Sequence, residues 1–186
     1  MLLKKVKLDY DFSIFFTKPY DTGERTCITH LSDELPEIYA PYGGMPKTYQ
    51  YENTKIYQLW WDETEVDFKE IGRQLSMDIT TISSIMQPPG CTIPLHKDTF
   101  YLTKQKYPDR TDLRVRALIY LEDYKIGHLT QYIAEGIGTT TNWRAGDGML
   151  WDSELQHLGA NVGLENKYTL QISGFYISQY DRPKNN

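Results

Sequence analysis

The sequence predicts a mainly β protein that folds as an antiparallel jelly-roll barrel, with a few helices near the N-terminus. The first observation is a series of about eight short strand-like segments between residues 80 and 177, separated by Gly and Pro. The second is that this half lacks the helical segments that would connect the strands of a parallel sheet. The third is length, because 186 residues suffice for one domain with one core.

The expected elements divide the chain into three parts within this single domain. Residues 1–79 are expected to form an N-terminal elaboration, with a strand at 8–16 and a helix near 64–77. Phe68, Ile71 and Leu75 would share one face of that helix. Residues 80–177 are expected to form the barrel core, and residues 178–186 a tail. The strands expected in the core are 82–86, 91–96, 113–121, 129–134, 138–143, 148–151, 158–162 and 168–177.

Composition excludes several classes of protein. The chain is 40% hydrophobic and 24% charged, which is typical of a globular domain. A net charge of −5 disfavours nucleic acid as a partner. No run of about 18 apolar residues could span a membrane, and the N-terminus lacks the apolar core of a signal peptide, so we expect a cytoplasmic protein. Cys27 and Cys91 form no Cys-x-x-Cys pair and are expected to be free thiols.

The segment Pro94–Leu95–His96–Lys97–Asp98 is the first candidate for a metal site. On an extended strand residues i and i+2 point to the same side, so His96 and Asp98 can face one ion while Lys97 points away. Taken alone, His-x-Asp is a weak signal that more often marks a hydrogen-bonded pair on a surface strand.

A third ligand must come from elsewhere, and the chain has four histidines. His30 lies in the N-terminal region, and His128 begins a strand beside Gly127. His157 begins a late strand that can lie beside the first pair in a closed barrel. Two His and one carboxylate leave coordination positions open, as in non-haem Fe(II) sites.

Lys167 lies ten residues after His157. It shares a strand face with Thr169, and a cation beside a hydroxyl can bind a carboxylate that enters the barrel. The order His-x-Asp, distal His and a basic residue ten positions later resembles the Fe(II)- and 2-oxoglutarate-dependent oxygenase superfamily. Lys in place of the commoner Arg is a feature shared with its prolyl hydroxylase group.

Two further segments carry the same resemblance, which covers about residues 80–177. The strand 113–121 is similar to one in the aspartyl/asparaginyl β-hydroxylase group, although this chain has Arg where that group has His. The likeness implies that Arg116 lies near 2-oxoglutarate and that Arg114 lies nearer the substrate, on the strand face that also carries Tyr120. The run 142–161 resembles the same hydroxylases, and within it Trp151 is a candidate for the pocket wall. Residues 1–79 resemble no family that we can name.

The resemblance implies a fold, a reaction and a set of cofactors. The fold would be a double-stranded β-helix, which is the cupin-like jelly roll. Iron would be held by His96, Asp98 and His157, and the distal carboxylate of 2-oxoglutarate by Lys167 and Thr169. The protein would be a dioxygenase that uses Fe(II), 2-oxoglutarate and O₂ to hydroxylate an amino-acid or peptidyl side chain, releasing succinate and CO₂.

Alternatives remain open at this point. A non-oxidative cupin-type protein that binds a metal or small molecule would share the barrel, but it would have no need of Lys167. A pseudo-enzyme would act through protein contacts alone, and a nucleic-acid demethylase is disfavoured by the acidic charge. The tyrosine-rich segments around residues 49–61 could line the pocket or form the face of a homodimer, and the sequence leaves both open.

Overall fold

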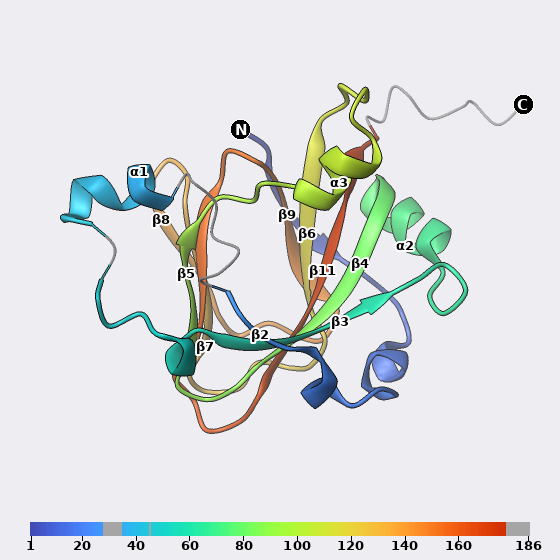
Figure 1. Cartoon of the computed structure of the whole chain (residues 1–186). Coiled ribbons are helices and arrows are strands. Elements are labelled where there is room, and N and C mark those ends of the chain that lie inside the picture. Colours follow the sequence, from blue (N-terminus) through green and yellow to red (C-terminus); the bar gives the residue numbers. More distant parts are fainter. Residues whose placement is uncertain (28–34, 45, 178–186) are drawn as a thin grey trace, which may run out of the picture.

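The computed structural model describes residues 1–27, 35–44 and 46–177, and it contains two antiparallel β-sheets (Figure 1). The prediction of a mainly β, cupin-like jelly roll is confirmed. The larger sheet has the order β1 (Leu3–Lys7), β9 (Asp147–Asp152), β6 (Arg114–Tyr120), β11 (Lys167–Tyr176), β4 (Met77–Gln87), β3 (Lys55–Trp61) and β2 (Glu24–Thr26). The smaller sheet has the order β5 (Cys91–His96), β10 (Gln156–Asn161), β7 (His128–Ile133) and β8 (Ile137–Thr140).

Helices occupy little of the described chain. The α-helices are α1 (Leu35–Tyr39), α2 (Phe68–Leu75) and α3 (Tyr101–Lys106). Single 3₁₀ turns are formed by η1 (Phe12–Phe16), η2 (Tyr20–Gly23), η4 (Ala40–Tyr42) and η5 (Tyr51–Asn53). Among the described residues, no helix is both long and apolar enough to cross a bilayer.

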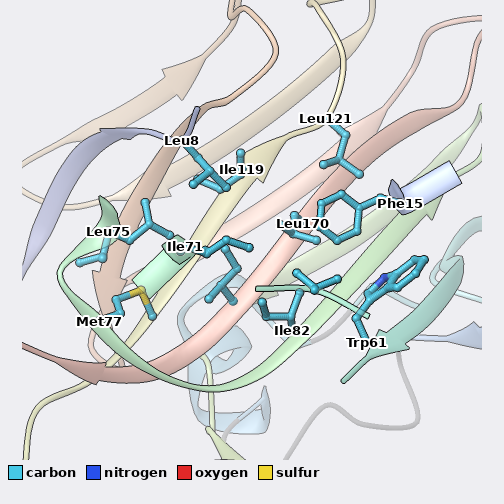
Figure 2. Packing of buried hydrophobic residues seen from close by; sticks show 14 of the residues in the cluster. Leu8, Phe15, Trp61, Ile71, Leu75, Met77, Ile82, Ile119, Leu121 and Leu170 are labelled. Atoms are coloured by element: carbon cyan, nitrogen blue, oxygen red, sulfur yellow. The ribbon is translucent and has the colours of Figure 1, made fainter. Parts of the chain in front are cut away.

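The two faces of the larger sheet have different roles, because side chains alternate along each strand. In β11, Leu170 and Ile172 belong to the main hydrophobic cluster, whereas Lys167 and Thr169 point to the other face. Figure 2 shows the main cluster, in which Ile71 of α2 packs among the sheet residues. One face of the sheet is therefore closed by apolar packing, and the other faces the smaller sheet and is available for polar chemistry.

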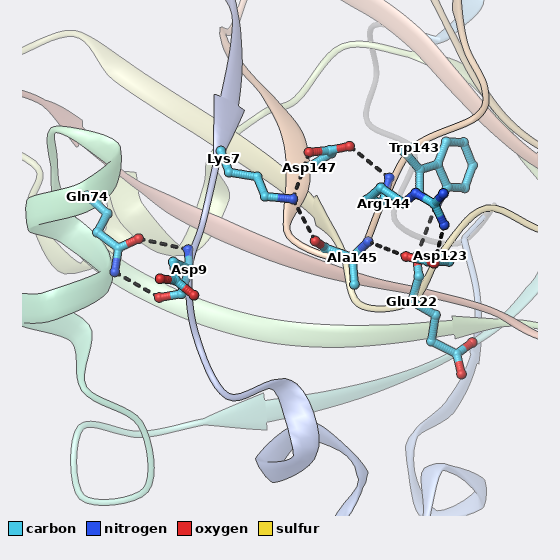
Figure 3. A network of polar contacts seen from close by, with 9 residues as sticks. All are labelled: Lys7, Asp9, Gln74, Glu122, Asp123, Trp143, Arg144, Ala145 and Asp147. Atoms are coloured by element: carbon cyan, nitrogen blue, oxygen red, sulfur yellow. Dashed lines mark hydrogen bonds and ion pairs between the residues drawn. The ribbon is translucent and has the colours of Figure 1, made fainter.

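The N-terminal region contributes strands to the barrel as well as covering it. β1 pairs with β9, and β2 and β3 extend the opposite end of the larger sheet. Figure 3 shows that Lys7 contacts Asp147 and that the Gln74 amide of α2 bonds the Asp9 backbone. These contacts fix the N-terminal segment to both α2 and the end of β9.

Two local expectations differ from the structure. Residues 8–16 do not form a strand, because Asp11 accepts a hydrogen bond from the Ser13 amide and starts the 3₁₀ turn η1. The expected helix near 64–77 is shorter: α2 begins after Asp67, which caps the Glu70 amide, and ends at Ser76 with a left-handed φ of 56°. The expected tail, 178–186, and His30 lie outside the described residues.

Candidate metal centre

Three metal-binding side chains meet between the two sheets. His96 ends β5, Asp98 follows it, and His157 lies in β10, directly opposite His96 in the strand pairing. One potential ligand atom from each residue lies within 4.8 Å of the others. His157 Nε2 is 3.8 Å from Asp98 Oδ2, and the two imidazole rings are 4.3 Å apart. The predicted group of three therefore converges, with Asp98 and His157 buried and His96 partly exposed.

The larger sheet holds the carboxylate of Asp98 in place. Trp151 Nε1 of β9 donates a hydrogen bond to Asp98 Oδ2 at 2.8 Å, and an Arg116 guanidinium nitrogen of β6 is 3.0 Å from Oδ1. Burial alone would raise the pKa of Asp98, but the charge of Arg116 and the neighbouring imidazoles outweigh it, and the pKa is lowered. Asp98 is therefore ionised and oriented, as a metal ligand requires.

Both imidazoles are oriented by backbone carbonyls two residues earlier in the chain. His96 Nδ1 is 2.8 Å from the Pro94 carbonyl oxygen, and His157 Nδ1 is 3.2 Å from that of Leu155. When Nδ1 donates its proton to a carbonyl, the lone pair of Nε2 is free for a metal. Burial lowers the pKa of His157 to about 3, with the neighbouring His96 contributing, so this ring is neutral at pH 7. The donor set thus fits a divalent cation.

Replacing Trp151 with Phe tests the contact to Asp98. The variant keeps an aromatic ring but loses the hydrogen bond to Oδ2, and we expect Fe(II) affinity to fall by about tenfold or more, as for other outer-shell partners. Anaerobic Fe(II) titration measures the change. Trp143→Phe is the matched control, because its indole donates to the Glu122 carbonyl oxygen instead. Equal affinities of the Trp151 variant and the wild type would contradict this role.

A buried ammonium group lies at the other end of the inner face. Lys167, the first residue of β11, is 4% exposed, and its Nζ donates to the Leu129 carbonyl oxygen at 2.5 Å. Within the described ranges, no carboxylate lies within ion-pair distance of Lys167. Burial consequently lowers the pKa of Lys167 to about 7. A buried cation without an acid is costly, so this position suits an incoming anion.

Hydroxyl groups surround the ammonium. Thr130 Oγ1 is 3.4 Å from Lys167 Nζ, and Thr169 is buried on the same strand face as Lys167. The Tyr120 hydroxyl is buried without a hydrogen-bond partner, and its ring stacks on Trp143 at 3.6 Å. Burial also raises the pKa of Tyr120 to about 12, so its hydroxyl remains a donor. The cluster offers several donors to one anionic group.

A cavity of about 580 Å³ opens beside the metal ligands. His96, Asp98 and Arg116 form its inner end, and the segment 97–103 forms one wall. Strands β2, β3, β4 and β11 supply most of the remaining wall. A ligand in this cavity would lie directly against the metal site, which makes it the candidate substrate pocket.

The other predicted residues lie at the cavity, at the metal centre, near Lys167 or outside all three. Arg116 lines the cavity, whereas Arg114, two residues earlier, does not, and its guanidinium bonds the Arg110 carbonyl oxygen. Trp151 contacts the metal ligand Asp98, and Tyr120 lies at the Lys167 end of the barrel, with Thr130 beside both. Tyr120 and Trp151 were predicted as substrate contacts, yet neither lines the cavity.

Sequence reasoning left open whether the segments around residues 49–61 line the pocket, and it did not single out the individual cavity residues of the N-terminal region. Arg25, Gln58 and Trp60 line it from β2 and β3. The only sequence signal was the alternation in the aromatic segment 57–61, which places Gln58 and Trp60 on one face. Arg25 carried no signal, because its position depends on the long-range pairing of β2 with β3.

Comparison with known proteins gives matches in structure only. No protein-family model and no curated protein sequence matches the chain. A Pseudomonas putida prolyl-4-hydroxylase aligns at 15% identity over 93% of this chain and 92% of its own, with a TM-score of 0.50. The epimerase SnoN of nogalamycin biosynthesis, which is non-haem and alpha-ketoglutarate-dependent, aligns at 11% identity over 94% of this chain and 77% of its own, with a TM-score of 0.57.

A third solved structure agrees with these two. The alpha-ketoglutarate-dependent carbocyclase SnoK aligns at 10% identity over 94% of this chain and 79% of its own, with a TM-score of 0.53. The predicted likeness to the aspartyl/asparaginyl β-hydroxylase group stays a prediction. The chain therefore has the fold of the Fe(II)- and 2-oxoglutarate-dependent oxygenases.

Proposed function

We propose that this chain is an Fe(II)- and 2-oxoglutarate-dependent oxygenase that hydroxylates an amino-acid or peptidyl side chain. One observation carries the proposal: a buried ammonium, with no acidic partner among the described residues, lies in the same barrel as an oriented His-Asp-His triad. A simple metal-binding cupin would require the triad alone. The combination fits a ligand that has one end on the metal and a carboxylate at the other end.

The residues of the site would have three roles: holding the iron, orienting Asp98 and binding the cosubstrate. His96, Asp98 and His157 would hold the iron, and Trp151 and Arg116 would keep the Asp98 carboxylate oriented. Lys167 would bind the distal carboxylate of 2-oxoglutarate, with the hydroxyl groups of Thr130, Thr169 and Tyr120 as neighbouring donors.

The bound group would supply the chemistry and the protein the geometry. Iron with 2-oxoglutarate and O₂ provides the oxidising power to break a C–H bond, with succinate and CO₂ as coproducts. The barrel excludes water from the buried end, and the cavity beside His96 orients the target carbon. Arg116 Nε is buried and has no hydrogen-bond partner among the described residues, and it would be available to donate to the cosubstrate.

Succinate release tests the proposal. Purified protein is supplied with Fe(II), ascorbate, O₂ and 2-oxoglutarate, first without a substrate and then with free amino acids and short peptides. We expect slow succinate formation without substrate and faster formation with at least one compound. His96→Ala is the control and should release none above background. If 2-oxoglutarate neither binds nor yields succinate under any condition, the chain is a non-oxidative cupin-type binding protein.

A further inference from the structure

Three cationic side chains line the cavity beside the metal site, and two of them have an acidic partner. Arg116 pairs with Asp98, and Lys97 Nζ is 3.1 Å from Glu154 Oε2. Asp98 is the one acidic residue among the described residues of the wall. The third cation, Arg25 of β2, has no acid within ion-pair distance in the part of the chain that the structure describes.

The Arg25 guanidinium is poorly compensated in its present surroundings. Its Nε is buried and has no hydrogen-bond partner among the described residues. The adjacent acid, Glu24, lies on the other face of β2, where it contacts Lys55 and Tyr51. Burial lowers the pKa of Arg25, and the nearby positive charge of Arg116 lowers it further. Such a group is stabilised when an anion enters the cavity.

A second buried polar atom lies on the same wall. Arg25 pairs with Ile56 across the β2–β3 register, which makes Gln58 its diagonal neighbour on the same face. Gln58 Nε2 donates a hydrogen bond to Ser83 Oγ at 2.7 Å, while Oε1 is buried with no partner in the described part of the chain. A ligand that brings both a carboxylate and an N–H group would satisfy both residues.

Much of the remaining wall is apolar, and Thr81, Thr99, Thr103, Gln171 and Ser173 add polar groups to it. Ile38, Ile56, Ile85, Ile93 and Phe100 line the cavity together with Trp60. These side chains would enclose the hydrocarbon part of a ligand, while its charged group lies against β2. The arrangement therefore selects an amphiphilic compound over a purely polar one.

We propose that Arg25 is the specificity-determining residue of this site and binds a carboxylate of the primary substrate, an amino acid or acylated amino acid with an apolar side chain. Gln58 Oε1 accepts a hydrogen bond from the nitrogen next to that carboxylate. This inference rests on the proposed function, since it assigns the substrate class of the same site. It adds a carboxylate contact from the N-terminal region to the metal and cosubstrate contacts.

Calorimetric binding to protein loaded with Ni(II) and 2-oxoglutarate, which does not turn over, tests the inference. The probes are the free proteinogenic L-amino acids and their N-acetyl derivatives, each compared with the matched carboxamide. We expect at least one apolar acid to bind at least about tenfold more tightly than its carboxamide. Arg25→Met should remove this preference, and Arg25→Lys should retain part of it. Arg73→Met is the control, because Arg73 pairs with Glu70 on α2, outside the cavity.

The outcomes distinguish a failure of the role proposed for Arg25 from a failure of the proposed oxygenase function. If no acid binds more tightly than its carboxamide, or if Arg25→Met keeps the preference, the role of Arg25 is wrong. The wild-type comparison of acid with carboxamide remains valid even if a variant fails to fold. Succinate release by wild-type protein without a carboxylate preference refutes the inference alone. A carboxylate preference that depends on Arg25, in protein that never binds 2-oxoglutarate, refutes the proposed function alone.

Discussion

His157→Ala is expected to abolish stoichiometric Fe(II) binding and to reduce succinate formation by more than about 100-fold. The reason is that His157 is a direct ligand, whereas loss of an outer-shell partner alone costs about 10- to 100-fold in metal affinity or activity. The ring is neutral at pH 7 and is oriented by the Leu155 carbonyl. Among the described residues, only His96 and Asp98 join it in the cluster of possible ligands. Anaerobic Fe(II) titration and succinate release measure the two effects.

His128→Ala provides the matched control. His128 is also buried, but its Nε2 contacts the Glu165 carbonyl oxygen, and it is not one of the three clustered ligands. We expect this variant to lose stability while it still binds one Fe(II) per chain. Full metal binding by the His157 variant would contradict the assigned centre.

Lys167→Met is expected to act in opposite directions on stability and on binding. In the absence of 2-oxoglutarate, Met fills similar space without a buried charge. Burial lowers the pKa of Lys167 to about 7, from its ordinary 10.5. The variant removes this cost, so its free energy of unfolding at pH 7 should exceed that of the wild type by on the order of a few kcal/mol. In contrast, the dissociation constant for 2-oxoglutarate should rise by about 10- to 100-fold, because a charge-assisted hydrogen bond is lost. Denaturant unfolding and calorimetry measure the two quantities.

The pH dependence of unfolding distinguishes the charge of Lys167 from its packing. Between pH 7 and 10.5 the unfolded chain keeps the proton on Lys167 while the folded chain releases it. The free energy of unfolding of the ligand-free wild type should therefore gain a contribution that rises with pH over this interval. Lys167→Met should lack that contribution. An identical pH profile in both proteins would show that folding does not lower the pKa of Lys167.

The metal centre could be predicted from the sequence because its chemistry depends on local spacing. The period of two in an extended segment predicted that His96 and Asp98 would meet. They do meet, although β5 ends at His96 and Asp98 lies just beyond it. Lys167 and Thr169 were placed on the inner face by the same rule. The sequence did not predict which strands pair. Only the pairing of β5 with β10 in the structure shows that His157 lies opposite His96.

The substrate side could not be predicted, because it depends on contacts between distant segments. Arg25 faces the cavity because β2 pairs with β3. The residues around Arg25 in the sequence do not predict that pairing. The predicted strand at 8–16 was wrong because the cap at Asp11 outweighs the apolar pattern that follows it. Tyr120 was placed on the correct strand face, but its position along the barrel axis required the register of β6 with β11.

β2 is a three-residue strand at one end of the larger sheet as described, with β3 as its hydrogen-bonded neighbour. A strand at such an edge has a hydrogen-bonded neighbour on one side only, so fewer strands surround its side chains. β11, by contrast, lies between β6 and β4 and carries Lys167. Under the proposed roles, substitutions in β2 would therefore change the choice of substrate without displacing the ammonium group on β11.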